Sequence, residues 1–225
     1  MPEETFYPKP SVTVDILVFT IKNSDLKILL IKRGLEPFKE MWAIPGGFTR
    51  IDESLELAAK RELEEETGIK EVYLEQLYTF GDVNRDPRGR VITIAYMALV
   101  NSEEIHLSAQ TDAKDANWFS VSKIPKLAFD HNKIVDYALK RLKWKFEYTT
   151  VAFSLLPEKF TLTQLQELYE TVFQKKLDKR NFRKKILSLN ILEEEEIMTD
   201  VSHRPPQLYS LKKRIGDVVE IMKMN

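Results

Sequence analysis

One segment in the first third of the chain, GFTRIDESLELAAKRELEEETGI at 47–69, restricts the possible folds more than any other. Ser54 is a good N-cap residue, and apolar residues recur every four positions after it. These positions are Leu55, Ala59 and Leu63. Gly68 follows where a helix end favours a left-handed residue. The segment therefore predicts an amphipathic helix from Ser54 to Thr67 that packs one face against a core.

The predicted helix carries three glutamates, Glu62, Glu65 and Glu66, whose offsets of three and four place them on one face. Carboxylates this close repel one another unless a cation neutralises them. Hard oxygen ligands suit Mg²⁺ or Mn²⁺, which keep several waters for a phosphate substrate. Glu53 would add a fourth carboxylate, and Arg61 would hold one of them in place. The alternative is a solvated face rich in glutamate, as charge runs usually are.

The rest of the first half has a mixed α/β pattern. Segments rich in β-branched residues predict strands at 12–21, 26–32, 71–80 and 91–100. Glycine and proline indicate that 34–47 is mostly loop, and a further helix is expected at 131–146. We therefore expect an α/β domain over residues 1–146.

Residues 147–225 show a different order of elements. One helix is expected at 163–173, with its first residue, a threonine, as the cap, and a second at 179–189. A β-hairpin is expected over 191–211, with its tip at 202–206. Two short helices followed by a hairpin are the outline of a winged helix-turn-helix domain.

The composition excludes several classes of protein. With 34 Lys+Arg against 35 Asp+Glu, the net charge of −1 excludes a globally basic nucleic-acid binder, although seven basic residues and one acid gather in 175–185. The chain has no cysteine, which excludes a disulfide, a thiolate nucleophile and a Cys-ligated metal. Its first residues lack the features of a signal peptide, and its apolar runs are too short to span a bilayer. We therefore expect a cytoplasmic protein with no membrane partner.

The stretch 47–69 resembles the Nudix hydrolase signature, G-x5-E-x7-R-E-U-x-E-E-x-G-U, in which U is a bulky aliphatic residue. The matching residues are Gly47, Glu53, Arg61, Glu62, Leu63, Glu65, Glu66, Gly68 and Ile69. No position departs from the signature, and a chance match has a probability of about one in a million per chain. The resemblance implies a Nudix α/β/α sandwich with a mixed sheet, and hydrolysis of a nucleoside diphosphate linked to another moiety.

The same resemblance implies a role for each matching polar residue. The implied ligands of Mg²⁺ or Mn²⁺ are Gly47, through its carbonyl, and the side chains of Glu62, Glu65 and Glu66. Glu65 is alternatively a helper of the catalytic base. Glu53 would be an acid close to the metal, and Arg61 would orient a glutamate. The metals held by these residues would neutralise the diphosphate and make a bound water nucleophilic near neutral pH.

Three further groups of side chains are left open by the sequence. The residue that takes the proton of the attacking water varies within this family and often comes from a distant loop. Its candidates are Glu103, Glu104, Asp112 and Asp115. Four aromatic residues are candidates to stack on a base, although core positions are the favoured interpretation: Phe38, Trp42, Phe48 and Tyr96. The histidines lack metal-ligand spacing and are interpreted as ordinary polar or boundary residues: His106, His131 and His203.

Between two predicted strands lies the polar stretch Arg85-Asp86-Pro87-Arg88-Gly89-Arg90. One interpretation is a simple hairpin turn, since Asp-Pro and Gly favour turns. The other is that Arg85 and Arg88 face the metal site and clamp phosphate or ribose oxygens. The stretch resembles one found in many ADP-ribose pyrophosphatases and their regulatory relatives. That resemblance favours ADP-ribose as the substrate, cleaved to AMP and ribose 5-phosphate.

Segment 155–187 resembles the winged-helix domain of Nudix-related transcription regulators of NAD or sugar metabolism. Its second helix would enter the major groove of double-stranded DNA with a basic set of side chains: Lys179, Arg180, Asn181, Arg183 and Lys184. Arg204, at the hairpin tip, would enter a minor groove. A homodimer would place two such helices one helical turn apart. The alternative is a helical appendage for dimerisation or packing, and the acidic run 193–196 counts against a phosphate-binding surface.

Two classes of function follow from these resemblances. The main interpretation is a Mg²⁺-dependent ADP-ribose pyrophosphatase with a linked regulatory domain, because the signature is unbroken. The alternative is a transcription regulator that binds an operator and senses ADP-ribose or a similar ligand with little or no catalysis. Many such regulators have a degraded signature, so an unbroken one favours retained metal binding and turnover. The two coexist if ligand binding changes the arrangement of the DNA-reading domains.

Overall fold

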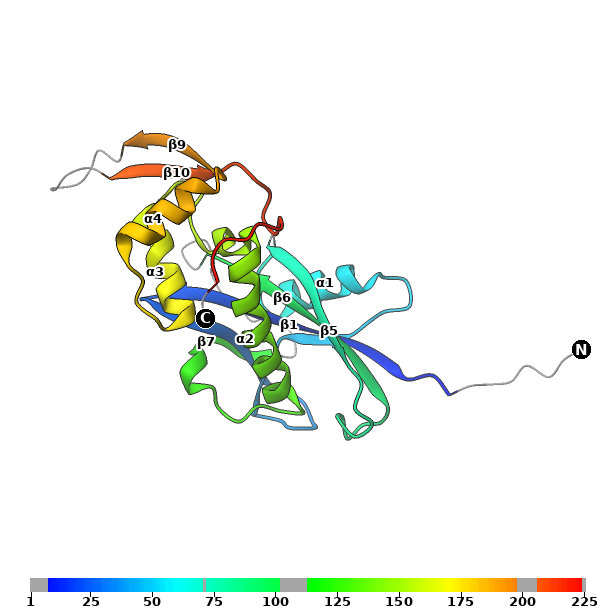
Figure 1. The fold of residues 1–225 in the computed structure, drawn as a ribbon. Helices are drawn as coiled ribbons and strands as arrows, with labels where there is room; N and C mark the ends of the chain where they lie inside the picture. The colour runs from blue at the N-terminus through cyan, green and yellow to red at the C-terminus, as the bar shows by residue number, and fades with distance from the viewer. Residues whose placement is uncertain (1–7, 71, 102–112, 198–205, 224–225) are drawn as a thin grey trace, which may run out of the picture.

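The computed structural model describes residues 8–70, 72–101, 113–197 and 206–223. Over these ranges the chain forms a large mixed sheet with a helix on each face, followed by two helices and a small sheet (Figure 1). None of the helices in these ranges is both long and apolar enough to cross a membrane.

The larger sheet is built around its first strand. β1 pairs in parallel with β6 from Ser11 to Phe19 and antiparallel with β2 beyond that point. The main order is β3-β2-β1-β6-β5, with β4 paired to β1 and β7 paired to β2. The strands are β1 (Ser11–Lys22), β2 (Asp25–Arg33), β3 (Trp42–Ala43), β4 (Gly46–Phe48), β5 (Tyr73–Phe80), β6 (Val91–Leu99) and β7 (Ala113–Ser120).

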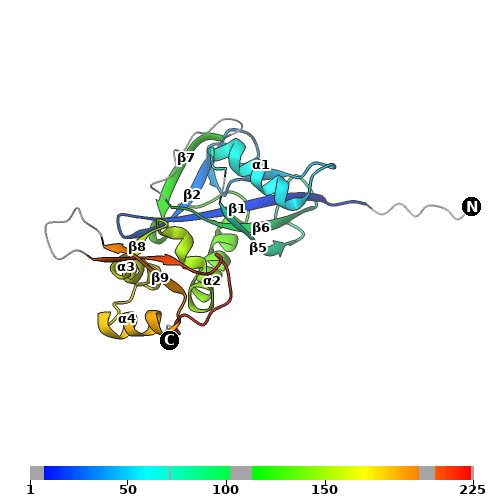
Figure 2. The same ribbon diagram turned by 90° about the horizontal axis from the view of Figure 1, so that it is seen from above.

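Two helices cover the opposite faces of this sheet (Figure 2). α1 (Leu55–Thr67) packs Ala58, Ala59 and Leu63 on one face, against residues of β1 and β6. α2 (His131–Tyr148) packs Ile134, Ala138 and Leu142 on the other. The α/β/α sandwich implied by the signature is therefore confirmed.

The last third of the chain forms a winged helix-turn-helix. After a short 3-10 helix (Thr150–Leu155), α3 (Leu162–Phe173) is followed by α4 (Lys179–Ser188). A small antiparallel sheet has the order β8-β10-β9, with β8 (Phe160–Thr161), β9 (Leu192–Ile197) and β10 (Gln207–Leu211). The predicted helices and hairpin are confirmed, and the hairpin tip lies outside the described residues.

One hydrophobic core joins the α2 side of the large sheet to the winged helix. Leu17 and Met97 of the sheet, Phe146 of α2 and Tyr169 and Phe182 of the winged helix belong to a single buried cluster. The ring centroids of Phe146 and Tyr169 are 5.4 Å apart. The division predicted at residue 146 stays a prediction, because α2 continues to Tyr148 and the core shows no break there.

Several local details differ from the sequence expectations. α3 begins earlier than expected, because Thr161, two residues before Thr163, is its cap. Thr161 and Gln164 form a capping box in which each side chain bonds the backbone of the other. Short strands β3, β4 and β8 and the longer β7 were not predicted. β3 and β4 lie in the segment 34–47 and its flank, where proline and glycine indicated a loop rather than paired strands.

We expect Phe146→Ala to lower the free energy of unfolding by about 3–5 kcal/mol, because its side chain is fully buried where the two halves meet. The matched control is Trp144→Ala on the same helix, whose side chain is 52% exposed and which we expect to cost less than about 1 kcal/mol. Urea unfolding followed by circular dichroism measures both. A loss below about 1 kcal/mol for Phe146→Ala would show that the shared core contributes little.

Candidate functional site

The candidate site begins on α1, which is capped as the sequence predicts. The Ser54 hydroxyl accepts a hydrogen bond from the Leu57 N–H, and Gly68 adopts the left-handed conformation at the other end, with φ 79°. Because Leu63 points into the core, the face that carries Glu62 and Glu66 turns toward β4. Local helix signals therefore place the acidic face against a glycine-rich strand.

Arg61 organises the acidic residues around it. Its guanidinium group makes a two-pronged contact with Glu53, from Nε to Oε2 at 2.9 Å and from Nη2 to Oε1 at 2.6 Å. Nη1 also donates to Glu62 Oε1 at 2.7 Å and to Glu65 Oε2 at 3.2 Å. The hydrogen bond from Arg61 holds the pKa of Glu53 at about 2. This arrangement gives Arg61 the geometry of a residue that orients glutamates.

Glu66 is the most deeply buried carboxylate on the helix. Its side chain accepts a hydrogen bond from the Gly46 N–H at 2.7 Å, and the residue is only 7% exposed. Burial raises the pKa of Glu66 to about 8, and the nearby charges of Glu62 and Asp15 act in the same direction. A carboxylate held this way binds either a proton or a cation near neutral pH.

Gly47 lies directly beside the Glu62 carboxylate. A Cβ atom at position 47 would lie 2.5 Å from Glu62 Oε1, so a side chain there would displace the carboxylate from its present position. Burial raises the pKa of Glu62, and the hydrogen bond from Arg61 opposes this shift. The missing side chain thus leaves space for a desolvated carboxylate beside the β4 backbone.

These groups line a cavity of about 330 Å³, within the size range of small-ligand pockets. Its walls come from β1, β2, β4, α1, the loop before β6 and the start of α2. The charged lining residues are Asp15, Arg33, Glu36, Glu62, Glu65, Glu66, Arg85, Asp86 and Arg88. Acidic groups outnumber arginines, so the cavity suits a ligand whose phosphates arrive with a cation. Within the described ranges, however, no group of three or more His, Asp or Glu side chains is arranged to hold a metal ion.

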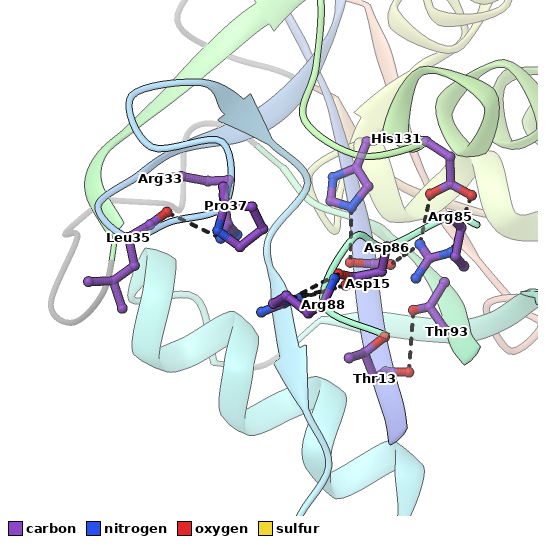
Figure 3. A network of polar contacts seen from close by, with 11 residues as sticks. Thr13, Asp15, Arg33, Leu35, Pro37, Arg85, Asp86, Arg88, Thr93 and His131 are labelled. Carbon is purple, nitrogen blue, oxygen red and sulfur yellow. Dashed lines mark hydrogen bonds and ion pairs between the residues drawn. The ribbon is translucent and has the colours of Figure 1, made fainter. Parts of the chain in front are cut away.

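Arg85 is buried at the edge of the cavity, in the network drawn in Figure 3. Its Nη2 and Nε atoms contact the two oxygens of Asp130, at 2.8 and 3.2 Å. Nη2 also lies 3.5 Å from Asp15 Oδ2. The structure therefore brings Arg85 to the cavity as the sequence suggests, but its guanidinium already serves two carboxylates.

Arg88 lies at the cavity wall between two aromatic rings. Its Nε and Nη2 atoms contact Asp86, with the shortest distance 2.7 Å. The guanidinium carbon lies 4.8 Å from the ring centroid of Phe48 and 5.3 Å from that of Phe129. Such contacts keep a cationic side chain in a fixed plane beside the ligand space.

The predicted core positions of the aromatic residues are confirmed for Tyr96, which is buried on the α1 side of the sheet. Trp42 and Phe38 are half-buried, and each packs edge-on against another phenylalanine ring. The core interpretation is wrong for Phe48, which is 43% exposed. Its strand, β4, is short and lies at the mouth of the cavity, so no second layer covers it.

The interpretation of His131 as an ordinary boundary residue is also wrong. The residue is 4% exposed and lines the cavity. Nδ1 accepts a hydrogen bond from the Ile44 N–H at 3.0 Å, and Nε2 lies 3.6 Å from Asp15 Oδ1. Burial lowers the pKa of His131, so the ring is neutral near pH 7. The other two histidines, His106 and His203, lie outside the described residues.

The structure places one of the four candidate bases. Asp115 is exposed on β7, where it accepts a hydrogen bond from the Asn117 side chain, and it does not line the cavity. Glu103, Glu104 and Asp112 lie outside the described residues, as does Arg204.

The basic residues of the winged helix lie on α4. Asp178 caps this helix through the Asn181 N–H, and Phe182 and Ile186 point into the core. The opposite face exposes Lys179, Arg180, Asn181, Lys184 and Lys185. Arg183 differs, because it is half-buried and donates to the Thr163 hydroxyl of α3 at 3.2 Å. Four of the five predicted DNA-binding residues on α4 are thus exposed on one helix.

Sequence reasoning missed several cavity residues. Asp15 interrupts an otherwise apolar strand, which was the available signal for a buried functional carboxylate. Arg33 lies at the end of β2, where its guanidinium contacts the Pro37 carbonyl and the Phe129 ring. Phe129, from the turn before α2, also lines the cavity, and no local pattern distinguished it.

Two family models match the chain. The NUDIX domain model matches residues 10–138, and the NrtR DNA-binding winged helix domain model matches residues 152–211. The two matched ranges correspond to the sandwich and to the winged helix of the structure.

Individual relatives agree with this division. The "ADPR responsive transcriptional repressor NtrR" of Acinetobacter baylyi is 38% identical over 92% of this chain and 84% of its own length. The ADP-ribose pyrophosphatase of Methanocaldococcus jannaschii is 44% identical over 62% of this chain and 77% of its own length. The crystal structure of Shewanella oneidensis NrtR complexed with a 27mer DNA has a TM-score of 0.77 at 35% identity, covering 89% of this chain and 93% of that one. The chain therefore belongs to the Nudix family, in the group whose Nudix domain is followed by an NrtR-type DNA-binding winged helix.

Proposed function

We propose that this protein is a transcription regulator that binds ADP-ribose in its Nudix cavity and operator DNA through its winged helix. The observation that carries this proposal is the single buried core that joins the ligand-binding domain to the DNA-reading helices. A ligand that changes one domain then has a physical route to the other. The similarity over nearly the whole chain to an ADP-ribose-responsive repressor supports the same function.

ADP-ribose suits the cavity in charge and in chemical type. Its diphosphate is matched by the arginines of the lining, of which Arg88 is held flat between two aromatic rings. Arg85 would add a second contact through its remaining donor. The polar stretch that carries both arginines resembles that of ADP-ribose pyrophosphatases. The relative from Methanocaldococcus jannaschii carries that activity in its name.

DNA recognition would rest on α4. An arginine and an asparagine near the start of a recognition helix are suited to guanine and adenine, and lysines to phosphates. Arg180 and Asn181 occupy these positions, with Lys179 and Lys184 beside them. Arg183 is assigned a smaller part, because its guanidinium also contacts α3. The wing contact by Arg204 and the homodimer stay predictions.

The direct test is the affinity for an operator with and without ADP-ribose. A duplex selected by the protein from a random DNA pool serves as the probe, and fluorescence anisotropy at fixed salt measures binding. We expect ADP-ribose to change the dissociation constant by about fivefold or more, the usual range of allosteric coupling. Selection of no duplex, or an unchanged constant, would contradict the proposal.

A second candidate function is hydrolysis of ADP-ribose, favoured by the unbroken signature and by its geometry. Arg61 holds Glu53 and Glu62 in place, while the Gly46 N–H holds Glu66. Catalysis would then reset the signal by consuming the ligand. The proton acceptor for this reaction has no assigned residue among the described ones.

The side chains present fit a divalent cation by their chemistry. Glu62 and Glu66 are hard oxygen donors, and burial raises both pKa values, so a bound cation would relieve the cost of their charges. Gly47 leaves space for Glu62 beside the β4 backbone. When bound, Mg²⁺ would neutralise the diphosphate and make a water nucleophilic. Glu65 would contribute less directly, because Arg61 and Arg50 already contact its oxygens.

We expect Glu66→Gln to abolish Mg²⁺-dependent formation of AMP from ADP-ribose while the fold remains intact. Since burial raises the pKa of Glu66 from 4.5 to about 8, folding takes up a proton between these values. The wild type therefore loses stability as the pH rises through that window, and Glu66→Gln, which lacks this proton, loses less. Chromatography of the products and urea unfolding at pH 5 and pH 8 measure the two effects.

The matched control for this variant is Glu56→Gln, which lies exposed on the same helix and pairs with Lys60. It is expected to keep both the turnover and the pH dependence of the wild type. Turnover that survives in Glu66→Gln would remove Glu66 from the site.

We expect Arg180→Ala to weaken operator binding by about 1–3 kcal/mol, the value of a lost side-chain contact to a base. ADP-ribose binding, measured by calorimetry, should be unchanged, because α4 does not line the cavity. Lys140→Ala is the control, since it removes one positive charge from an exposed position on α2. Equal weakening by the two variants would indicate a nonspecific charge effect rather than recognition by α4.

A further inference from the structure

α2 touches the ligand cavity at one end and the DNA-reading helices at the other. His131, its first residue, lines the cavity, and Phe146 in its last turn contacts Tyr169 of α3. With 18 residues, the helix is about 27 Å long. Figure 1 shows it running along the sheet toward α3.

The first turn of α2 is held in an unusual way. The other three α-helices in the described ranges are capped by a side chain: Ser54 for α1, Thr161 for α3 and Asp178 for α4. Asp130, the cap residue of α2, makes no such bond, although aspartate is among the best capping residues. Its φ of −96° and ψ of 18° also differ from the extended conformation of the other caps.

The Asp130 carboxylate is instead committed to Arg85. Both oxygens of Asp130 accept hydrogen bonds from this arginine, at 2.8 and 3.2 Å. Arg85 is shared with Asp15, so one guanidinium balances two buried carboxylates. Its Nη1 group makes no hydrogen bond to the described residues, and the residue lines the cavity. A ligand oxygen that accepts a hydrogen bond from Nη1 therefore shares with Asp130 and Asp15 the charge of one guanidinium.

The last turn of α2 is tied to the winged helix and to the C-terminal segment. A helix end leaves four carbonyls without intrahelical partners. The Tyr169 hydroxyl donates to the Phe146 carbonyl at 2.9 Å. The Ile221 N–H donates to the Glu147 carbonyl at 2.8 Å, and the Val219 N–H to the Tyr148 carbonyl at 2.9 Å. Since these bonds replace solvent, movement of the last turn moves α3 and the C-terminal segment.

We propose that the Arg85–Asp130 pair is a ligand-operated switch that sets the position of α2 and, through its last turn, of the DNA-reading helices. The switch rests on the proposed ADP-ribose-dependent regulation and supplies its route. Without ligand, Arg85 holds Asp130 away from its own helix. When a phosphate or ribose oxygen binds Arg85, the Asp130 carboxylate turns to accept a hydrogen bond from the first turn, where the His131 and Lys133 N–H groups otherwise bond the Ala128 and Asp130 carbonyls. Two discrete bonding arrangements thus correspond to two positions of the helix.

The switch predicts a specific phenotype for Asp130→Asn. Asparagine keeps the size and capping ability of aspartate but not its charge, so it caps α2 even when Arg85 is free of ligand. Operator affinity of the ligand-free variant should equal that of the ligand-bound wild type within about twofold. Added ADP-ribose should then change it by less than about twofold, against about fivefold or more for the wild type.

A second variant tests the far end of the helix. Tyr169→Phe removes the hydrogen bond to the Phe146 carbonyl and keeps the ring. ADP-ribose affinity by calorimetry should stay within about twofold of wild type, since Tyr169 does not line the cavity, while the ADP-ribose effect on operator binding falls at least about threefold. Tyr137→Phe on α2 is the matched control, because its hydroxyl has no hydrogen-bond partner among the described residues. It should keep the full effect.

The possible outcomes separate the two proposals. A wild type that binds operator identically with and without ADP-ribose overturns the proposed function, and the switch with it. A wild type that responds, together with Asp130→Asn and Tyr169→Phe that respond by the same factor, overturns the switch alone. If Asp130→Asn does not fold, Tyr169→Phe decides by itself: loss of response with retained ligand affinity supports the switch, and a full response overturns it.

Discussion

The burial of carboxylates around one cavity is the constraint on which the rest of the structure depends. Asp15, Glu62 and Glu66 are removed from water within one Nudix sandwich, and none of them is stable there as an isolated charge. Arg61 and Arg85 each neutralise more than one carboxylate. Arg85 joins β1 to the start of α2, and the hydrogen bond from the Gly46 N–H to Glu66 joins β4 to α1, so buried carboxylates connect the three layers of the sandwich. Any phosphate ligand adds its negative charge to the carboxylates that these arginines already neutralise.

The same balance of charge fixes the start of α2, and α2 carries this constraint to the second domain. Its apolar face is packed in a core that continues without a break into α3 and α4. Close packing transmits small shifts as movements of whole elements rather than absorbing them. The winged helix is therefore not an independent module on a flexible tether. Its orientation depends on a helix whose first residue lies in the ligand cavity.

The sequence predicted those features that depend on interactions between residues close together in the chain. The caps of α1 and the spacing of Glu62 and Glu66 were visible because helix termini and the 3.6-residue period act over a few residues. The hydrogen-bonded pair of Arg85 and Asp130 was not visible in the sequence, since the two residues are 45 positions apart in the chain. β3 and β4 were missed because they are two- and three-residue strands, stabilised by pairing with distant partners rather than by their own composition. The motif at 85–90 therefore located the site but not the role of each arginine.

An unbroken catalytic signature does not by itself separate an enzyme from a sensor. The glutamates that would hold a metal for hydrolysis would also hold a metal–diphosphate complex for recognition, since both tasks require hard oxygen donors facing a phosphate. The two tasks differ in what else they need: hydrolysis requires a positioned proton acceptor, and sensing requires a connection to an output. The connection through α2 is continuous in the described residues, so the structure meets the requirement that is specific to the proposed sensing function.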